Sequence, residues 1–340
     1  MKYAPILIPT LCRDQHFVRL IESLKKNTWA KYTDVYIGLD YPPAPKYEEG
    51  YKKICQYLEG DFSDFASFNV IRHSQNVGSL ANMESLRAVT LTKYDRYIRT
   101  DDDAEFAPNF IEYMDKCLMQ YEEDDNVIAV TGYSYPIDWQ VSKGASVLKE
   151  NFICPMWGTG FWRDSYLKIK KEIENGCLKE SVPWVLKNNL TKGMLTTCQC
   201  EYVDLCLSPI FEKTLAARMT DVATRMYMSI YDKYVIVPIV SKVRNWGFDG
   251  SGEYCPKMQT TEKKINARNY NYAEQLLDES YTFDLLPDSL QLTDKNRALL
   301  NVFEDVPFKK CLRVNLKIVL CHLLGVKNYK KILLNISKFR

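Results

Sequence analysis

Three consecutive aspartates are the residues of this sequence whose types and spacing most clearly suggest chemistry. Asp101, Asp102 and Asp103 directly follow the strand-like segment YDRYIRT at residues 94–100. Adjacent carboxylates repel one another, so their pKa values rise unless a cation offsets the charge. Mg²⁺ and Mn²⁺ bind carboxylate oxygens and keep coordination positions open for substrate phosphates. The triplet therefore indicates either a metal site for a diphosphate or an ordinary solvated acidic loop.

The elements expected around the triplet favour the metal site. Apolar runs predict strands at residues 4–10, 34–40, 67–72, 94–100, 127–132 and 234–240. Apolar residues at helical spacing predict helices at residues 16–26, 47–58, 80–90, 108–121 and 221–231. This alternation predicts an α/β fold with a mostly parallel sheet, in which ligands lie at the carboxyl ends of the strands. Arg13, Asp40, the loop at residues 76–79 and the triplet all follow such strands, so we expect them to share one crevice.

The rest of the chain gives weaker patterns. Residues 134–154 are expected to be mostly loop, and residues 244–255 (RNWGFDGSGEYC) a glycine-rich turn region. Residues 181–219 show no clear periodicity. Beyond residue 260 the chain is polar and predicted to be helical. Residues 312–340 place apolar side chains at helical intervals among seven Lys and Arg, without any acidic residue.

Composition bounds the class of protein. Hydrophobic residues make up 46% of the 340 residues and charged residues 26%, as in a globular protein. The 45 basic and 43 acidic residues nearly cancel, so nucleic acid is not an expected partner. The 11 cysteines include no pair of CxxC motifs, which argues against a zinc site and against a disulfide framework. With no apolar run of about 20 residues and no signal peptide at the start, the sequence predicts a cytoplasmic protein.

The triplet and its surroundings resemble a known family. The segment DDDAEFAPNFIEYM is similar to the metal-binding DxD segment of nucleotide-sugar glycosyltransferases of the GT-A type. The resemblance continues through PILIPTLCRDQHF, YIGLDYPP, RHSQNVGSLANMESL, VTGYSYP, MWGTGFWRDSY and NWGFDGSGEYC, and covers about residues 4–256. A more distant likeness exists to the N-acetylglucosaminyltransferase that starts complex N-glycans. Two positions depart from the family pattern: Tyr254 stands where a His is frequent, and Asp101 where a Glu is frequent.

The resemblance implies a GT-A fold, which is a Rossmann-like α/β domain with a mixed, mostly parallel sheet flanked by helices. Its nucleotide-sugar-binding half would span residues 1–133, and its acceptor-binding and catalytic half residues 134–258. Residues 259–340 would form a helical C-terminal extension that ends in a basic amphipathic tail.

The resemblance also implies roles for the residues at the donor site. Asp103 would bind the metal ion, Mn²⁺ or Mg²⁺, and Asp101 and Asp102 would contact the donor sugar or ribose. Asp40 would accept a hydrogen bond from the base of a UDP- or dTDP-sugar, and Arg13 would pair with the diphosphate. The remaining donor-binding candidates are Thr10, Asn76, Ser79 and Asn82. Alternatively, Arg13 is a surface residue and residues 76–79 form only a turn and a helix cap.

The acceptor site and the catalytic base are expected in the second half of the domain. Trp157, Gly158 and Trp162 would form the acceptor wall, although both Trp side chains could equally belong to the core. Asp221 would be the base that takes the proton from the acceptor hydroxyl, since relatives carry an Asp at the start of the corresponding helix. The alternative is that Thr220 or Asp221 only caps the helix. Other candidates for the base are Glu201, Asp204 and Asp249.

These features predict a metal-dependent inverting glycosyltransferase. Its acceptor would be a glycan or a lipid-linked glycan in bacterial capsule, O-antigen or exopolysaccharide synthesis. The basic tail predicts a helix that lies on the inner face of the plasma membrane, or alternatively one that packs on the protein itself. Two other functions compete: a nucleotidyltransferase, which lacks support because no Gly-rich phosphate loop follows the first strand, and a non-catalytic carbohydrate-binding protein.

Overall fold

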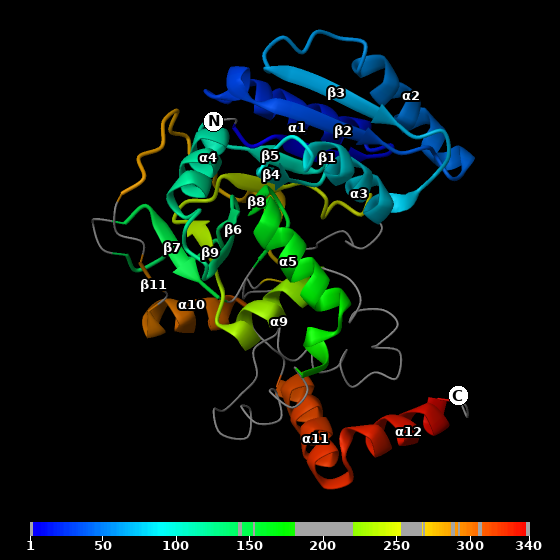
Figure 1. Ribbon diagram of the computed structural model, residues 1–340, viewed down its shortest axis with the longest axis vertical. Helices are drawn as coiled ribbons and strands as arrows, with labels where there is room; N and C mark the ends of the chain where they lie inside the picture. Colours follow the sequence, from blue (N-terminus) through cyan, green and yellow to red (C-terminus); the bar gives the residue numbers. More distant parts are fainter. Residues whose placement is uncertain are drawn as a thin grey trace.

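The computed structural model describes most of the chain and gives one large sheet with helices on both faces (Figure 1). The described residues are 3–141, 145–151, 154–180, 220–252, 267, 269–286, 290–291, 293–304 and 308–337. Within them the main sheet has nine strands. Their order is β11 (Leu290–Gln291), β7 (Val147–Glu150), β9 (Tyr234–Pro238), β6 (Val127–Thr131), β8 (Thr159–Trp162), β4 (Arg96–Arg99), β1 (Ile6–Thr10), β2 (Asp34–Leu39) and β3 (Ser67–Arg72).

Most pairings in this sheet are parallel, as the sequence predicts. Strands β3, β2, β1 and β4 are parallel neighbours, and β6 pairs in parallel with β9. Strand β8 runs antiparallel between β4 and β6, and β7 runs antiparallel to β9. A small second sheet pairs β5 (Ala104–Phe106) with β10 (Val243–Asn245). The predicted α/β fold with a mixed, mostly parallel sheet is confirmed.

Helices cover both faces of the sheet. The helices of the domain are α1 (Asp14–Lys25), α2 (Glu48–Tyr57), α3 (Gly78–Thr90), α4 (Phe110–Gln120), α5 (Arg163–Glu174) and α9 (Asp221–Tyr231). Short 3-10 turns lie at Ala30–Tyr32, Pro45–Tyr47, Cys177–Glu180 and Tyr272–Glu274. The end of α1 is joined to the start of α4, because the Asn27 side chain accepts from the Ile111 N–H. On the other face α3 and α5 are joined by the ion pair of Glu84 with Lys170.

The periodic segments form the elements that their side chains predict. Strand β1 is apolar along its length because both faces are covered, and Ile6, Leu7 and Ile8 have no exposed surface. In α1, the predicted apolar face of Phe17, Leu20, Ile21 and Leu24 is buried completely. Thus the first half of the domain follows directly from apolar spacing.

The second half of the domain contains elements that no sequence pattern predicts. Residues 134–154, which were expected to be mostly loop, include β7. The segment MWGTGFW at residues 156–162 contains β8, and α5 begins directly after it. Strands β7 and β8 have only four residues each, which is too short for a recognisable period. A glycine in β8 allows this strand to pack closely against α4, since a Cβ on Gly160 would lie only 2.8 Å from Met114 Cε.

The C-terminal part begins as an irregular segment and ends in helices. Residues 269–286 run over α4, where Lys116 donates to the Phe283 carbonyl and Asn109 to the Thr282 carbonyl. Strand β11 then joins the sheet edge beside β7. The predicted C-terminal helices follow as α10 (Asp294–Glu304), α11 (Phe308–Leu324) and α12 (Val326–Ser337). Among the described residues no helix has the length and apolar character needed to cross a bilayer.

Candidate active site

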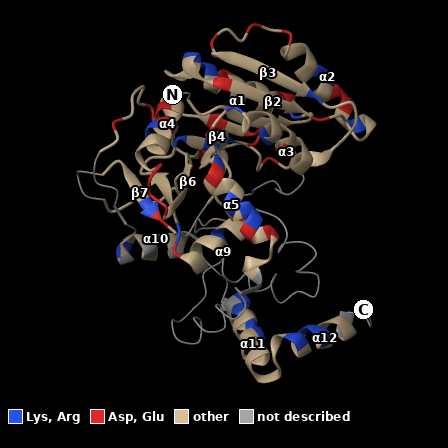
Figure 2. Cartoon of the chain, in the orientation of Figure 1, with Lys and Arg blue, Asp and Glu red and all other residues tan. Residues whose placement is uncertain are grey.

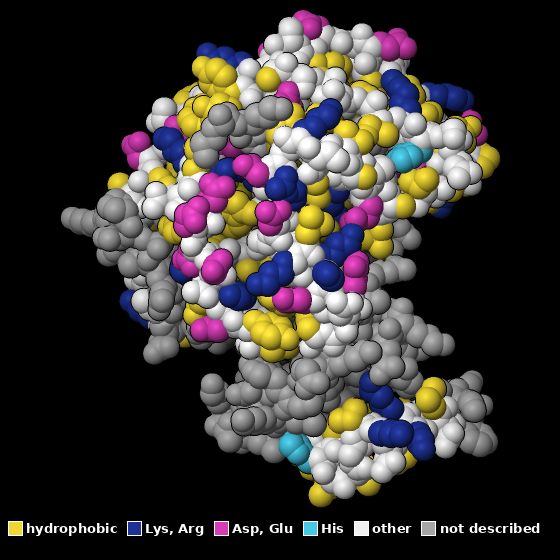
Figure 3. Space-filling view, in the orientation of Figure 1, with side chains coloured by type: hydrophobic (Ala, Val, Ile, Leu, Met, Phe, Trp, Pro, Cys, Tyr) yellow, Lys and Arg dark blue, Asp and Glu magenta, His cyan; other side chains and the backbone are white. Residues whose placement is uncertain are grey.

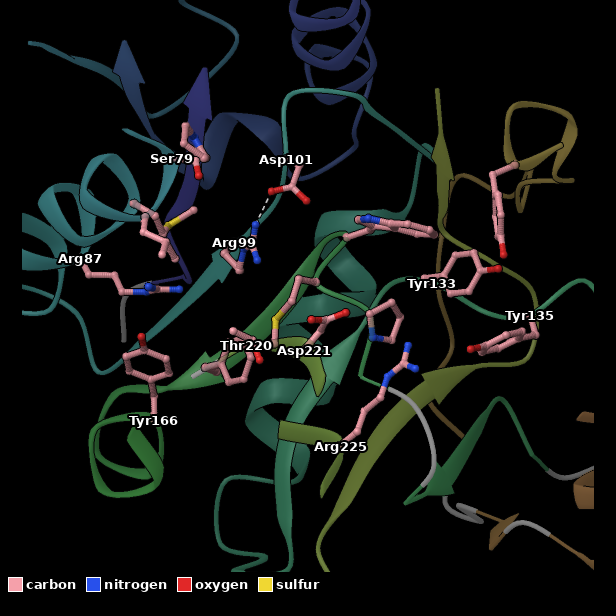
Figure 4. Close-up of a pocket in the computed structure, with 18 residues that line it drawn as sticks. Ser79, Arg87, Arg99, Asp101, Tyr133, Tyr135, Tyr166, Thr220, Asp221 and Arg225 are labelled. Carbon is pink, nitrogen blue, oxygen red and sulfur yellow. Dashed lines mark hydrogen bonds and ion pairs between the residues drawn. The ribbon is translucent and has the colours of Figure 1, made fainter. Parts of the chain in front are cut away.

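The strand order places a crevice between β1 and β4. The chain runs outward from β1 to β2 and β3, and then returns to β4 on the other side of β1. In such sheets ligands bind outside the carboxyl ends of the strands at this reversal point. A pocket of about 400 Å³ opens here, between the end of β1, the segment after β4 and the start of α9 (Figure 4).

Charged and aromatic side chains dominate the lining of this pocket. Two carboxylates, Asp101 and Asp221, lie on opposite sides of it, with Arg99 beside Asp101 and Arg225 on the side of Asp221 (Figure 4). The aromatic lining residues are Tyr133, Tyr135, Trp157, Phe161, Tyr166 and Tyr272. Aromatic faces with a few convergent charges are typical of sites that bind small polar ligands. The pocket thus offers carboxylate and guanidinium groups together with flat apolar surface.

The aspartate triplet is divided between two environments. Asp101 faces the pocket and forms an ion pair with Arg99. Asp102 and Asp103 instead point toward the start of α1, where the Arg13 guanidinium hydrogen-bonds to both carboxylates. The Thr10 hydroxyl also donates to Asp102 Oδ2 at 2.8 Å, which ties the end of β1 to the segment after β4. Arg13 therefore supplies a positive charge that offsets the repulsion between these adjacent carboxylates.

The small β5–β10 sheet completes the surroundings of Asp103. The Asn245 amide donates to Asp103 Oδ1 at 3.3 Å, and the Trp246 N–H donates to the Asp103 carbonyl at 2.8 Å. A Cβ on Gly247 would overlap Asp103 Oδ2, so a glycine lets this loop pass against the carboxylate. Asp103 is consequently held from two directions, by Arg13 and by the loop after β10.

Burial and charge act against each other at these carboxylates. Burial raises the pKa of Asp103, the Arg13 guanidinium opposes this, and Asp102 adds to it by repulsion. Enclosure likewise raises the pKa of Asp101; Arg99 opposes this, and Asp103 and Asp221 add to it. Burial on its own would lower the pKa of Arg13, but Asp102 and Asp103 raise it above its ordinary value. A further cation at this place would stabilise the ionised carboxylates.

The donor atoms of the triplet fit a hard divalent cation. Asp101, Asp102 and Asp103 offer only carboxylate oxygens, the ligand type that Mg²⁺ and Mn²⁺ prefer. Within the described part of the chain, no three His, Cys, Asp or Glu side chains are grouped closely enough to hold an ion by themselves. An ion at Asp103 would therefore need oxygens from a bound substrate to complete its coordination, as is usual for Mg²⁺ beside phosphates.

Asp40 directly follows β2 but is not among the residues that line the pocket, and its carboxylate is engaged with the loop at residues 76–79 and with the Tyr41 N–H. It accepts hydrogen bonds from the N–H groups of Val77 and Gly78 at 2.9 Å each, and from the side chain of Asn76 at 3.1 Å. Gly78 is the first residue of α3, so Asp40 also stabilises the positive end of that helix. The contact with a nucleobase that the resemblance implies stays a prediction.

The other donor-side candidates differ in exposure. Asn82 is buried and bridges two strands by donating to the Gly38 carbonyl at 2.8 Å and to the Thr10 carbonyl at 3.5 Å. Ser79 is exposed and lines the pocket, whereas Asn76 is exposed on the loop outside it. Of this group, only Ser79 can meet a ligand of the pocket directly.

Asp221 is available for chemistry because it does not cap its helix. Thr220 is the N-cap of α9, with its hydroxyl accepting from the Ala223 N–H at 3.1 Å. The exposed Asp221 side chain projects into the pocket from the next position (Figure 4). Asp249, a second candidate for the base, instead accepts from the N–H of Ser251 and contacts His16 Nε2 at 3.0 Å. The candidates Glu201 and Asp204, and also Tyr254, lie outside the described residues.

The two tryptophans predicted for the acceptor side have separate places. Trp157 lines the pocket and packs edge-on against Tyr133 and Tyr272, with ring centroids 5.1 and 5.5 Å apart. Trp162 is buried on β8 and donates to the Leu118 carbonyl of α4, so it belongs to the core rather than to the lining. Gly158 has a positive φ of 60°, and a Cβ there would lie 2.8 Å from Phe106. This glycine allows Trp157 to sit at the pocket rim.

Several lining residues were not predicted. Arg99 precedes the triplet and Tyr133 follows β6, so their positions at strand ends could have identified them. Arg87 and Arg225 lie within helices, and no local pattern distinguishes them from other helical arginines. Tyr272 comes from the irregular segment after residue 269, which no sequence pattern connects with the pocket.

Searches of protein-family descriptions and of curated proteins return no match for this sequence. Solved structures do match in part. The chain is similar to the mannosyltransferase PcManGT from Pyrobaculum calidifontis in complex with GDP-Man and Mn²⁺, at 15% identity over 48% of this chain and 46% of that one, with a TM-score of 0.35.

Two structures of the S. aureus protein TarS also match. One, TarS 1-349, is 12% identical over 70% of this chain and 58% of that one, with a TM-score of 0.36. The other is 12% identical over 51% of this chain and 30% of that one, with a TM-score of 0.33. The chain spans between about a third and three fifths of the length of these structures.

Proposed function

We propose that this protein is a glycosyltransferase that moves a sugar from a UDP- or dTDP-sugar to a glycan acceptor. One observation carries the proposal: two carboxylates from separate elements, Asp101 and Asp221, face one aromatic pocket at the reversal point of the sheet. The donor would enter from the side of β1 and β4, and the acceptor would lie against Trp157 and its aromatic neighbours. The sequence resemblance described above supports the same reaction.

The donor diphosphate would be held by positive charge around the triplet. Arg13 would contact the phosphates while it remains beside Asp102 and Asp103, and Arg99 would bind from the pocket side. Asp103, with Asp101 or Asp102, would hold Mn²⁺ or Mg²⁺. Such an ion, when bound, supplies positive charge that stabilises the departing nucleotide diphosphate.

Asp221 would act as the general base in an inverting transfer. Its carboxylate would accept the proton of the acceptor hydroxyl while the hydroxyl oxygen forms a bond to the anomeric carbon. The bond from that carbon to the diphosphate oxygen breaks, and the electron pair leaves with the nucleotide diphosphate. One base on the side opposite the leaving group suffices for inversion, and Asp221 lies across the pocket from Asp101.

A comparison of two aspartate variants tests the assignment. Asp221→Asn is expected to lower the rate of transfer by roughly 10²- to 10⁴-fold, the usual contribution of a general base. Donor binding, measured by the thermal shift that the nucleotide sugar causes, should stay near normal. Asp249→Asn is the matched control, because its carboxylate contacts His16 and Ser251 and does not line the pocket. Near-normal turnover of Asp221→Asn together with an inactive Asp249→Asn would disprove the assignment.

The released product separates this reaction from the competing enzymatic one. A glycosyltransferase releases a nucleoside diphosphate, whereas a nucleotidyltransferase releases pyrophosphate. A thermal-shift screen of UDP-, dTDP- and GDP-sugars with Mn²⁺, with Mg²⁺ and with a chelator would identify the donor. Stabilisation by none of them would favour a non-catalytic carbohydrate-binding protein. We further propose a cytoplasmic place in bacterial surface-polysaccharide synthesis, which the identity of the acceptor would test.

A further inference from the structure

Helix α11 carries two apolar faces, and only one of them is buried. Val314, Ile318 and Cys321 form the inner face, with at most 2% of each side chain exposed. The opposite face has a second apolar stripe that recurs every three or four positions. Its members are Leu312 (49% exposed), Leu316 (56%), Val319 (42%), Leu320 (43%) and Leu323 (75%). Burial of the helix against its surroundings therefore leaves a continuous row of large apolar side chains in solvent.

Lys and Arg residues occur both on α11, which carries the outer stripe, and on α12. Segment 308–337 contains Lys309, Lys310, Arg313, Lys317, Lys327, Lys330 and Lys331 and has no acidic residue. Figure 2 shows the blue bands on α11 and α12 without any red, in contrast to the mixed colours of the sheet domain. The same helices extend from the end of the molecule that is farthest from β3 (Figure 1). In Figure 3 yellow and blue side chains gather on them.

The charge of the chain is strongly divided between this pair of helices and the remainder. Residues 308–340 have nine basic and no acidic residues, whereas the whole chain has a net charge of +2, so residues 1–307 carry a net charge of −7. An anionic surface would attract the helix pair and repel the domain. Charge alone would thus bind the molecule by its C-terminal end.

We propose that the outer stripe of α11, with the lysines around it, docks on an anionic lipid surface. Exposed leucines beside basic residues match a helix that lies at the level of the lipid headgroups, with its apolar side chains toward the acyl chains. The 17 residues of α11 span about 25 Å, less than the roughly 30 Å of a bilayer core, and four of its first ten residues are Lys or Arg, so the helix lies along the surface and does not cross it.

Other occupants fit this face less well. Two copies joined through the stripe would bring their basic residues together, which is unfavourable. A nucleic acid would engage the basic residues and leave the leucines exposed, because phosphate contacts need no apolar surface. An anionic membrane satisfies both features at once.

Vesicle flotation with the full-length chain tests the proposal. We expect binding to vesicles of phosphatidylcholine with about one third phosphatidylglycerol, and weak binding to pure phosphatidylcholine. The triple variant Leu316→Ser, Leu320→Ser and Leu323→Ser should lower the partition coefficient by roughly tenfold or more. Its control is Leu276→Ser with Tyr281→Ser, which removes exposed apolar side chains elsewhere and should leave binding unchanged.

Charge is tested separately. Lys309→Gln, Lys327→Gln and Lys331→Gln together should weaken binding roughly a hundredfold at low salt, at about fivefold per lysine. Lys52→Gln with Lys53→Gln, two exposed lysines of α2, is the control. Equal flotation of all variants, or equal binding to neutral and anionic vesicles, would overturn the proposal. So would a dimer of the wild type that the leucine variant abolishes. No sugar donor is present in this assay, so its result is independent of the proposed enzymatic activity.

Discussion

At the scale of residues, Arg13 is the most informative side chain of the site. It reaches from the start of α1 to two members of the triplet that lie about 90 positions further along the chain. The sequence predicts an arginine near a diphosphate, but it does not predict that the same guanidinium binds Asp102 and Asp103. This long-range contact turns Asp102 and Asp103 away from Asp101. The local pattern DDD therefore does not predict that the three carboxylates lie in two environments.

Removal of Arg13 should expose the repulsion that it compensates. Arg13→Met leaves two largely buried carboxylates without their cation, which should lower the free energy of unfolding by roughly 2–4 kcal/mol. Urea unfolding with and without Mn²⁺ checks this, and Mn²⁺ should stabilise the variant more than the wild type. Arg163→Met, which breaks an exposed ion pair with Asp164, should show neither effect. If Mn²⁺ together with a nucleoside diphosphate affects neither protein, the triplet does not bind the ion.

Gly247 should matter for function more than for folding. An alanine there would overlap Asp103 Oδ2, and the carboxylate would have to leave its contact with Arg13. Gly247 is not among the glycines with positive φ, so the backbone itself accepts alanine. We expect Gly247→Ala to lower kcat/KM for the donor by roughly 10- to 100-fold. The loss of stability should be smaller than for Arg13→Met, because Arg13 keeps its contact with Asp102. Gly60→Ala at the end of α2 is the control; an equal loss of activity there would contradict the explanation.

At the scale of elements, sequence periodicity predicts the long elements and misses the short ones. The strands and helices up to β6, except the three-residue β5, follow from runs such as ILIPT and from apolar helix faces such as that of α1. Strands β7 and β8 have four residues each, and their pairing with distant strands is decided by packing, for example by Gly160 against Met114. The loop after β6 follows from the sequence pattern. The segment before β8, which lines the pocket, stands out in the sequence only by its tryptophans.

Helix α4 contains a buried carboxyl that should make stability depend on pH. Asp115 Oδ1 accepts from the Ala4 N–H at 2.9 Å, and Asp115 Oδ2 has no hydrogen-bond partner among the described residues. Burial raises the pKa of Asp115 to about 7, above the value of about 3.9 expected in the unfolded chain. The folded state therefore binds the extra proton between these values, and the stabilisation is full below about pH 4 and lost as pH rises through about 7.

Asp115→Asn should remove this dependence. The amide oxygen can still accept from the Ala4 N–H, and no charge is buried at high pH. We expect the variant to gain roughly 1–3 kcal/mol of unfolding free energy relative to the wild type at pH 8, and much less at pH 5. Denaturant unfolding at the two pH values measures the difference. Parallel pH profiles for the two proteins would show that another group is responsible.

At the scale of the whole molecule, the segment at residues 269–286 joins the C-terminal part to the site. It is fixed by the ion pair between Lys242 and Asp278 and by the bond from Asn109 to Asp278. Tyr272 of the same segment lines the pocket. The domain boundary near residue 258, with a helical extension after it, stays a prediction. In the structure Asp278 of the irregular segment contacts Lys242, 36 positions away, and Asn109, 169 positions away, and β11 pairs with β7. No local sequence pattern predicts these contacts.

Loss of that ion pair should loosen the whole segment. Asp278→Asn leaves the buried Lys242 ammonium without its counter-charge, at an expected cost of about 3 kcal/mol. Hydrogen exchange of the amides at residues 269–286 should accelerate, and urea unfolding should report the lower stability. Asp284→Asn, an exposed carboxylate in the same segment, should change neither. Unchanged exchange in Asp278→Asn would show that other contacts fix the segment.

The reversed direction of β8 has a consequence for how specificity can diversify. A parallel strand presents the residues that follow it to the pocket, whereas β8 presents the residues that precede it, from Pro155 to Trp157. The pocket wall around Asp101 therefore comes from the segment after β4, and the wall around Trp157 from the segment before β8. Under the proposed function, substitutions before β8 would change the acceptor wall and leave the donor-side residues in place.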